Sequence, residues 1–163
     1  MSKKALKKYL SELSKEQLEE QILVLYNRLK EVKQFYDFVF NPNEKKKIEE
    51  CKFKIHNEYF PISGRKPKKR RSVAQKFIKT FIKLGVEPSL IAEIMLFNLE
   101  TAIRYSADNQ VKQESFFVSI HRSYIDAQNY IQVNGLISSF QDNLQKVKEE
   151  IWNQNWFNKE AFD

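Results

Sequence analysis

The chain has 163 residues, a formal net charge of +7, 42% hydrophobic residues and 13% aromatic residues. This length and composition exclude a largely disordered chain and allow one domain with a sizeable core. Only three glycines and four prolines are present, which leaves few residues for tight turns and argues against an all-β fold. We therefore expect an all-α fold in a single domain over residues 1–163.

Cysteine usage and hydropathy indicate the compartment. Cys51 is the only cysteine, so no internal disulfide is possible. No apolar run approaches the ~20 residues that span a bilayer, and residues 1–6 lack the apolar core of a secretory signal. We expect a cytoplasmic protein with no membrane partner.

The N-terminal residues predict a short helix and a second helix that begins with a cap. Over roughly residues 3–13, leucines recur at helical spacing. The same stretch carries a small basic cluster of Lys3, Lys4, Lys7 and Lys8. Residues 14–17 read Ser-x-x-Gln, a capping box that begins the next helix.

That second helix is predicted to run from Ser14 to about Phe38, with apolar residues that alternate steps of four and three. This heptad-like seam consists of Leu18, Ile22, Leu25, Leu29, Val32, Tyr36 and Val39. Two interpretations stay open. The helix packs its apolar face within its own domain, or it dimerises as a coiled coil.

A third helix is predicted over residues 41–59. Asn41 as N-cap and Pro42 at the first helical position begin it, and Pro61 ends it because proline disfavours a helical residue before it. Its apolar face consists of Ile48, Cys51, Ile55 and Tyr59.

Residues 62–71 are predicted to form a basic loop. Residues 72–75 then read Ser-x-x-Gln, which predicts another capping box and a helix that ends at Gly85. Pro88 begins an apolar helix that we expect at the centre of the core. Helices over about 110–132 and from 136 onward follow. We expect about six or seven helices, packed as antiparallel hairpins.

The most informative segment lies between Tyr59 and Val86, where nine basic residues occur and no acidic residue does. Such a concentration costs self-repulsion, so a folded protein usually keeps one for a polyanion or as a solvated loop. The candidate polyanion-binding residues are Arg65, Lys66, Lys68, Lys69, Arg70, Arg71, Ser72, Lys76, Lys79 and Lys83.

The helix after the loop suits phosphate groups. A helix N-terminus presents unpaired N–H groups and a partial positive charge, so Arg70, Arg71 and Ser72 are expected to hold a first phosphate. Lys76, Lys79 and Lys83 lie within about 60° of one another around the helix axis, and they extend the positive charge for about 10 Å along the helix. Contact through a phosphate backbone would be weakly sequence-selective.

Motifs for catalysis or metal binding are not found in the sequence. It has no dinucleotide-binding, phosphate-binding-loop, zinc-protease or nucleophile-elbow pattern. His56 and His121 are the only histidines, and Cys51 is expected to be an inert buried thiol. We expect no catalytic residue, no metal site and no cofactor.

Several stretches resemble a family of small bacterial proteins of unknown function. They are Lys3 to Leu10, Tyr36 to Phe38, Glu58 to Pro61, Gly64 to Pro67 and Arg71 to Gln75, and the resemblance covers most of the chain up to about Tyr105. It implies a bacterial cytoplasmic protein and supplies no catalytic residue. In a eukaryotic cell, residues 67–71 would also fit a nuclear-import signal, an interpretation that a bacterial origin weakens.

The sequence supports two hypotheses for the function, each from a different class of protein. The leading hypothesis is a non-catalytic protein whose basic loop and helix N-terminus bind an RNA or DNA phosphate backbone, with free nucleic acid or the ribosome as partner. The alternative is a helical protein–protein interaction module with an acidic or helical partner and no nucleic-acid role. In either case we expect a monomer or a homodimer.

Overall fold

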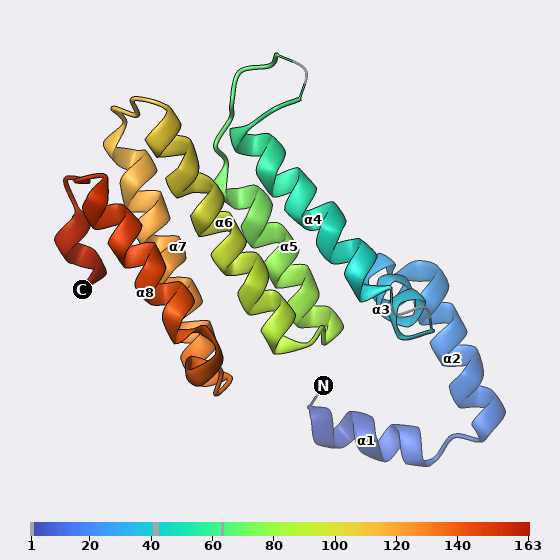
Figure 1. The fold of residues 1–163 in the computed structure, drawn as a ribbon. Helices are drawn as coiled ribbons and strands as arrows, with labels where there is room; N and C mark the ends of the chain where they lie inside the picture. The colour runs from blue at the N-terminus through green and yellow to red at the C-terminus, as the bar shows by residue number, and fades with distance from the viewer. Residues whose placement is uncertain (1, 41–42, 63) are drawn as a thin grey trace. The chain divides into compact units, whose positions relative to one another are not determined.

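Eight α-helices and one short 3₁₀ helix make up the described part of the chain, residues 2–40, 43–62 and 64–163 of a computed structural model (Figure 1). These residues contain no β-strand. The helices are α1 Lys3–Ser11, α2 Lys15–Arg28, α3 Lys30–Phe40, α4 Glu44–Tyr59, α5 Arg71–Leu84, α6 Pro88–Asp108, α7 Glu114–Val133, α8 Ile137–Asn153 and the 3₁₀ helix η1 Lys159–Phe162. The expected all-α fold is confirmed. The antiparallel hairpin packing stays a prediction.

The chain divides into two compact units, residues 1–43 with α1 to α3 and residues 44–163 with α4 to η1. The single domain expected over residues 1–163 stays a prediction. Two compact units can still unfold as one cooperative domain, and the structure does not test this. Within the described ranges, no helix is both long and apolar enough to cross a bilayer. The cytoplasmic location also stays a prediction.

The capping box predicted at Ser14 is present at the start of α2. The Gln17 N–H donates to Ser14 Oγ at 3.3 Å, and the Ser14 N–H donates back to Gln17 Oε1 at 2.9 Å. Two backbone donors at the helix start are thereby satisfied by side chains. The local sequence rule therefore places the start of α2 correctly.

The single helix predicted from Ser14 to about Phe38 is wrong, because the chain bends at Leu29. This residue has an extended backbone, with φ −114° and ψ 113°, and separates α2 from α3. The bend lets Tyr26 of α2 donate its hydroxyl hydrogen to Asp37 Oδ1 of α3 at 2.8 Å. The extra break explains why eight α-helices are found where six or seven were expected.

The third predicted helix corresponds to α4. Its predicted N-cap and first residue, Asn41 and Pro42, lie outside the described residues. The predicted apolar face of Ile48, Cys51, Ile55 and Tyr59 is buried. The C-terminal end at Tyr59 is as expected.

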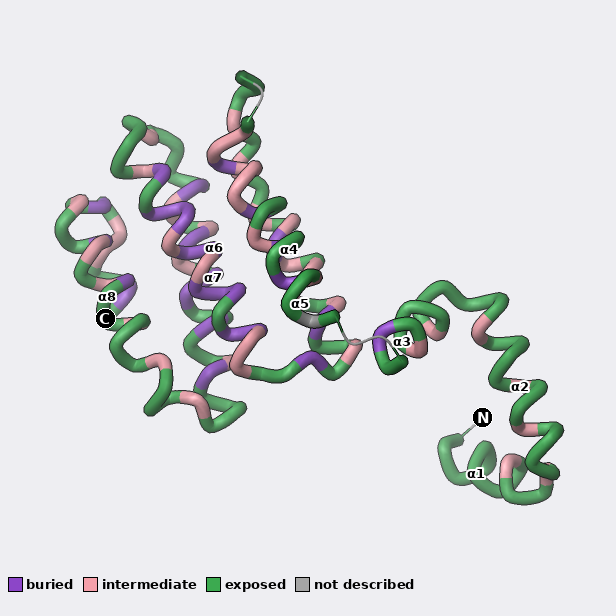
Figure 2. The backbone as a smooth tube through the Cα atoms, turned by 45° about the vertical axis from the view of Figure 1, so that its right-hand side comes forward, coloured by how far each residue is buried: buried purple, intermediate pink, exposed green. Residues whose placement is uncertain are grey.

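The core of the C-terminal unit is built around α6, which packs against α4, α5, α7 and α8. Eleven of the 21 residues of α6 are buried, as Figure 2 shows by its purple stretches. This burial confirms the expectation that the helix begun by Pro88 lies at the centre of the core. Besides α6, α5 also packs against α4 and α7. The basic segment, which leads into α5, therefore lies next to both of these helices.

Candidate polyanion-binding site

The basic segment is anchored at its centre by an ion pair between Arg70 and Glu58, the penultimate residue of α4. Arg70 Nε and Nη2 donate to Glu58 Oε2 and Oε1 at 2.9 and 2.7 Å. The Glu58 side chain is only 12% exposed, and the hydrogen bonds from Arg70 lower the pKa of its carboxyl group. Arg70 is therefore already paired with a carboxylate of its own chain.

Arg71 is paired in the same way with α7. Its Nε donates to Ser123 Oγ at 2.7 Å, and its Nη2 forms an ion pair with Asp126. With the Gln75 amide turned to satisfy its hydrogen bonds, the amide oxygen accepts from both terminal nitrogens of Arg71 at 2.6 and 2.8 Å. The Arg71 side chain is 21% exposed and ties α5 to α7.

The N-terminus of α5 differs from the sequence prediction. The N-cap is Arg70 and the helix begins at Arg71, so Ser72 lies inside the first turn and the predicted capping box is wrong. The Arg70 N–H donates to Glu58 Oε2 at 3.3 Å. The Glu58 carboxylate thus occupies the helix start, where the sequence suggested a bound phosphate.

Lys69 completes the base of the loop. Its backbone N–H donates to the Glu58 carbonyl oxygen at 2.8 Å, and its ammonium group lies 5.6 Å from the centre of the Tyr105 ring. Lys69 also has a left-handed backbone, with φ 53°. A non-glycine residue adopts this conformation at some cost, which the contacts of Lys69 to α4 and α6 offset.

The remaining cations of the loop lie beyond this base. Arg65, Lys66 and Lys68 are exposed and form no ion pair within the described ranges. Figure 1 shows the loop extending past the ends of α4 and α5. We call Arg65, Lys66 and Lys68 the loop cations.

A second group of cations lies on the outward face of α5. Lys76, Lys79 and Lys83 are exposed, and in the part of the chain that the structure describes none of them is in an ion pair. The opposite face of the helix buries Ala74 and Phe81. The three residues span about 10 Å along α5 at 1.5 Å per residue. We call them the α5 lysines.

Charge in this region is therefore divided between two roles. The arginines predicted to hold the first phosphate, Arg70 and Arg71, are used to fasten the loop and α5 to the fold. The loop cations and the α5 lysines form no ion pair within the described residues, although the charge of Lys68 contributes to lowering the pKa of Glu58. Because like charges repel, these six groups favour any anion that reaches them.

Two acidic residues of this region were not identified from the sequence as partners of the basic segment. Glu58 lies just outside the acid-free stretch, and its role depends on the loop returning to α4. Asp126 has Arg122 at the i,i+4 spacing of a helical ion pair, yet it pairs with Arg71 from another helix. No local signal distinguishes such tertiary pairs from surface charges.

The described residues show few groups that could serve as metal ligands or as a catalytic nucleophile. Groups of three or more His, Cys, Asp or Glu side chains that could hold a metal are not found there. Cys51 is fully buried, and burial raises the pKa of its thiol to about 12. His121 Nε2 lies 2.9 Å from the Ala161 carbonyl oxygen, within hydrogen-bond distance. The absence of a catalytic role stays a prediction.

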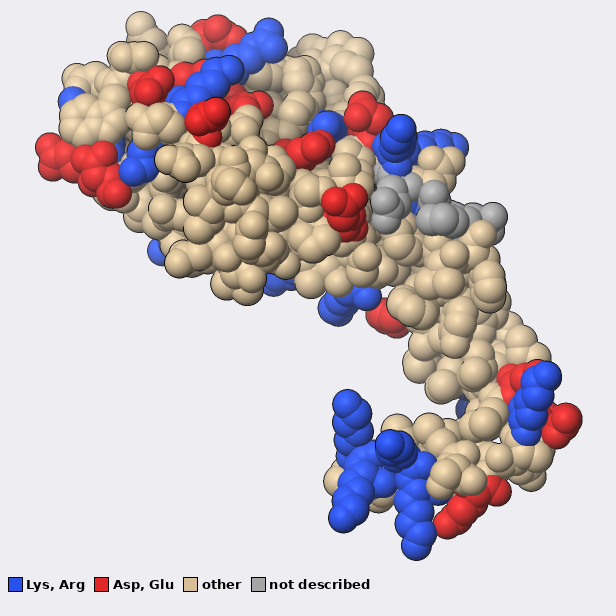
Figure 3. Space-filling model, turned by 60° about the horizontal axis from the view of Figure 1, so that its bottom comes forward, with Lys and Arg blue, Asp and Glu red and all other residues tan. Residues whose placement is uncertain are grey.

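The N-terminal unit carries the smaller basic cluster. Lys3, Lys4, Lys7 and Lys8 are all exposed on α1. Figure 3 shows blue side chains gathered at this end of the unit. This cluster is separate in sequence from the candidate site on α5.

The chain belongs to a family described as "Family of unknown function (DUF6155)", which matches residues 1–163. The resemblance to a family of unknown function is thereby confirmed and extends over the whole chain. The bacterial origin stays a prediction. Searches of curated proteins and of solved structures gave no match.

Proposed function

We propose that this member of the DUF6155 family is a non-catalytic protein that binds a polyanion, in particular an RNA or DNA phosphate backbone. The observation that carries the proposal is the division of charge in the basic segment. Arg70 and Arg71 are paired with carboxylates, while the loop cations and the α5 lysines are exposed and unpaired within the described residues.

The arrangement favours an extended ligand over a small anion. A small anion needs converging donors, and the helix start where a first phosphate was expected is occupied by the Glu58 carboxylate. The α5 lysines instead form a line of about 10 Å, along which successive phosphates can bind. We therefore propose phosphate contacts that are weakly sequence-selective, on free nucleic acid or on the ribosome.

The site proposed from the structure is smaller than the one proposed from the sequence. It keeps Arg65, Lys66, Lys68, Lys76, Lys79 and Lys83 as ligand contacts, with Ser72 beside them on the outward face of α5. Lys69, Arg70 and Arg71 become residues that position the loop. Their ion pairs and ring contact support that role.

An acidic protein surface is the rival ligand. It would contact the same cations, but a folded partner presents carboxylates at fixed positions and does not release condensed counterions as a nucleic acid does. The first test therefore uses nucleic acid directly. It measures binding of a labelled 20-nucleotide single-stranded RNA, and of a duplex DNA of the same length, by fluorescence anisotropy.

Three variants carry the test. The first is Lys76→Gln with Lys79→Gln and Lys83→Gln. The second is Arg65→Gln with Lys66→Gln and Lys68→Gln. The control, Lys30→Gln with Lys112→Gln and Lys146→Gln, removes the same charge from lysines that are exposed elsewhere.

We expect each of the first two variants to raise the Kd about tenfold or more at 100 mM salt, because each removes three phosphate contacts. The control should stay within about threefold of the parent protein. All three substitute exposed side chains, so circular dichroism and Tm should be unchanged. Equal losses of affinity in all three would show that only net charge matters and would refute the site.

A further inference from the structure

The N-terminal unit leaves an unusual amount of apolar surface uncovered. Neither α1 nor α2 contains a buried residue. Ten large apolar side chains of the unit are exposed: Leu6, Tyr9, Ile22, Leu23, Val24, Leu25, Leu29, Phe35, Val39 and Phe40. They are 40% to 75% exposed. Because Ile22 to Leu25 are consecutive residues of α2, about 100° apart, this apolar surface lies on more than one side of the helix.

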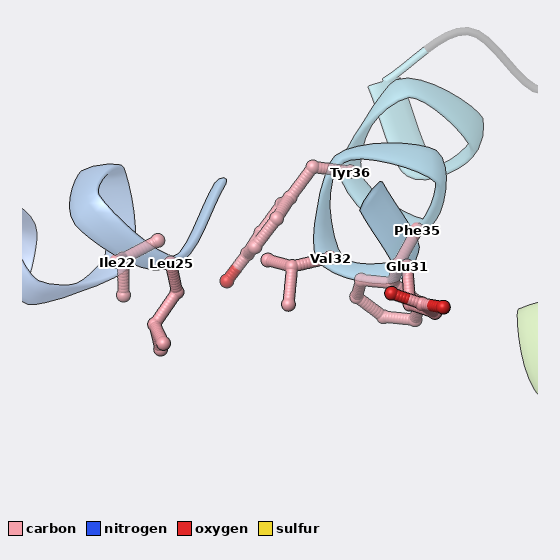
Figure 4. Close-up of a pocket in the computed structure, with 6 residues that line it drawn as sticks. All are labelled: Ile22, Leu25, Glu31, Val32, Phe35 and Tyr36. Carbon is pink, nitrogen blue, oxygen red and sulfur yellow. The ribbon is translucent and has the colours of Figure 1, made fainter. Parts of the chain in front are cut away.

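This surface is hollowed between the helices. One hollow of about 370 Å³ lies between α2 and α3 and is lined by Ile22, Leu25, Val32, Phe35 and Tyr36, with Glu31 at its edge (Figure 4). In that view the Tyr36 ring reaches from α3 toward Leu25 of α2. A second hollow of about 430 Å³ lies between α1 and α2 and shares Leu25. Gln17, Glu20 and Gln21 give this second hollow a partly polar lining. We call the two hollows together the α2–α3 groove.

The charged residues in the walls of the groove are acidic, and two cations lie beside them: Lys15 pairs with Glu19 at 3.7 Å, and the Lys33 ammonium group lies 5.7 Å from the centre of the Tyr26 ring. Among the residues that line these hollows and the neighbouring one on α2 and α3, the acidic ones are Glu19, Glu20, Glu31 and Asp37, and none is Lys or Arg. The preferred occupant of such a groove is a helix with an apolar face and basic flanks.

The chain itself contains a helix of this kind. Along α1, Lys3, Lys4, Lys7 and Lys8 surround apolar residues that include Leu6 and Tyr9, and α1 has no acidic residue. All of α1 except the half-buried Leu10 is exposed. A basic apolar helix and an acidic apolar groove therefore occur in the same unit.

We propose that the protein forms a homodimer in which α1 of each copy lies in the α2–α3 groove of the other. Because the exchange is reciprocal, the interface has two-fold symmetry and closes on itself. Each copy then covers both its basic helix and its acidic groove.

Light scattering coupled to size exclusion tests the oligomeric state of the full chain at 10–100 μM. We expect a dimer for the parent protein. A helix variant, Lys3→Glu with Lys4→Glu, Lys7→Glu and Lys8→Glu, makes α1 acidic, and a groove variant, Glu19→Lys with Glu20→Lys and Glu31→Lys, makes the groove basic. Each variant should be monomeric. Circular dichroism checks that both variants stay helical.

Mixing the two variants is the decisive step. The acidic α1 of the helix variant matches the basic groove of the groove variant, and the basic α1 of the groove variant matches the acidic groove of the helix variant. An equimolar mixture should therefore form a heterodimer, and a chain with all seven substitutions should dimerise with itself. A monomeric parent protein, dimers that persist in both single variants, or a mixture that stays monomeric would each overturn the proposal.

Discussion

Arg70 and Glu58 form a two-pronged ion pair that closes the base of the basic loop against the end of α4. The same carboxylate accepts the Arg70 backbone N–H at the start of α5. One acidic side chain thus neutralises a guanidinium group and caps a helix. This arrangement explains how a segment so rich in positive charge holds a defined conformation.

Removal of this carboxylate should loosen the loop. We expect Glu58→Gln to lower Tm by roughly 3–6 °C, because charge-assisted hydrogen bonds are lost in a chain of this size. Amide hydrogen exchange should rise in residues 65–72 and stay unchanged in α6. Asp142→Asn, at an exposed position of α8, serves as the control and should change neither measurement.

The contribution of Glu58 should depend on pH with a definite sign. Its pKa is lowered in the folded protein from an ordinary value of 4.5, chiefly by the side-chain hydrogen bonds from Arg70. The stabilisation is therefore complete above about pH 4.5 and is lost as the pH falls through the lower folded pKa. The Tm difference between the parent protein and Glu58→Gln should be constant from pH 6 to 8 and shrink below pH 4.5. A difference that grows on acidification would contradict the pairing.

Arg71 and Lys76 should behave differently although both are basic residues of α5. Arg71→Ala removes contacts to Ser123 and Asp126, and we expect it to lower the free energy of unfolding by about 1–3 kcal/mol. Lys76→Ala affects an exposed side chain and should leave stability unchanged within ~0.5 kcal/mol. Urea denaturation of both variants checks this contrast. Equal stabilities would show that the Arg71 pair contributes nothing.

Cys51 should be unreactive in the native protein. It is fully buried on α4, and burial raises its thiol pKa to about 12, so little thiolate exists at pH 8. We expect a thiol-reactive dye to modify the native protein at least 100-fold more slowly than the urea-unfolded protein at that pH. Rapid labelling of the native protein would mean that α4 opens locally.

The sequence predicts the helices well where the determinants are local. Ser14 and Gln17 form the expected capping box, and the apolar spacing on α4 and α6 corresponds to the buried faces. The bend at Leu29 is not marked by glycine or proline. It accompanies packing between α2 and α3, including the hydrogen bond from Tyr26 to Asp37, which a periodic pattern does not reveal.

The candidate site could be predicted only in part, because some of its contacts also depend on tertiary packing. The positions of the basic residues are plain from the sequence, and the exposure of the α5 lysines follows from their spacing along the helix. The pairing of Arg70 with Glu58 depends on the loop returning to α4. The pairing of Arg71 with Asp126 crosses 55 residues of sequence. Both pairs arise from tertiary packing, so Ser72 is a weaker helix-start signal than the Glu58 carboxylate.

The salt dependence of RNA affinity tests the proposed phosphate contacts most directly. Each phosphate neutralised on a single strand contributes about −0.7 to the slope of log affinity against log salt concentration. The parent protein should therefore show a slope steeper by about 2 than the variant that lacks Lys76, Lys79 and Lys83, while the control variant keeps the parent slope. Identical slopes for the parent and the α5 lysine variant would contradict the account.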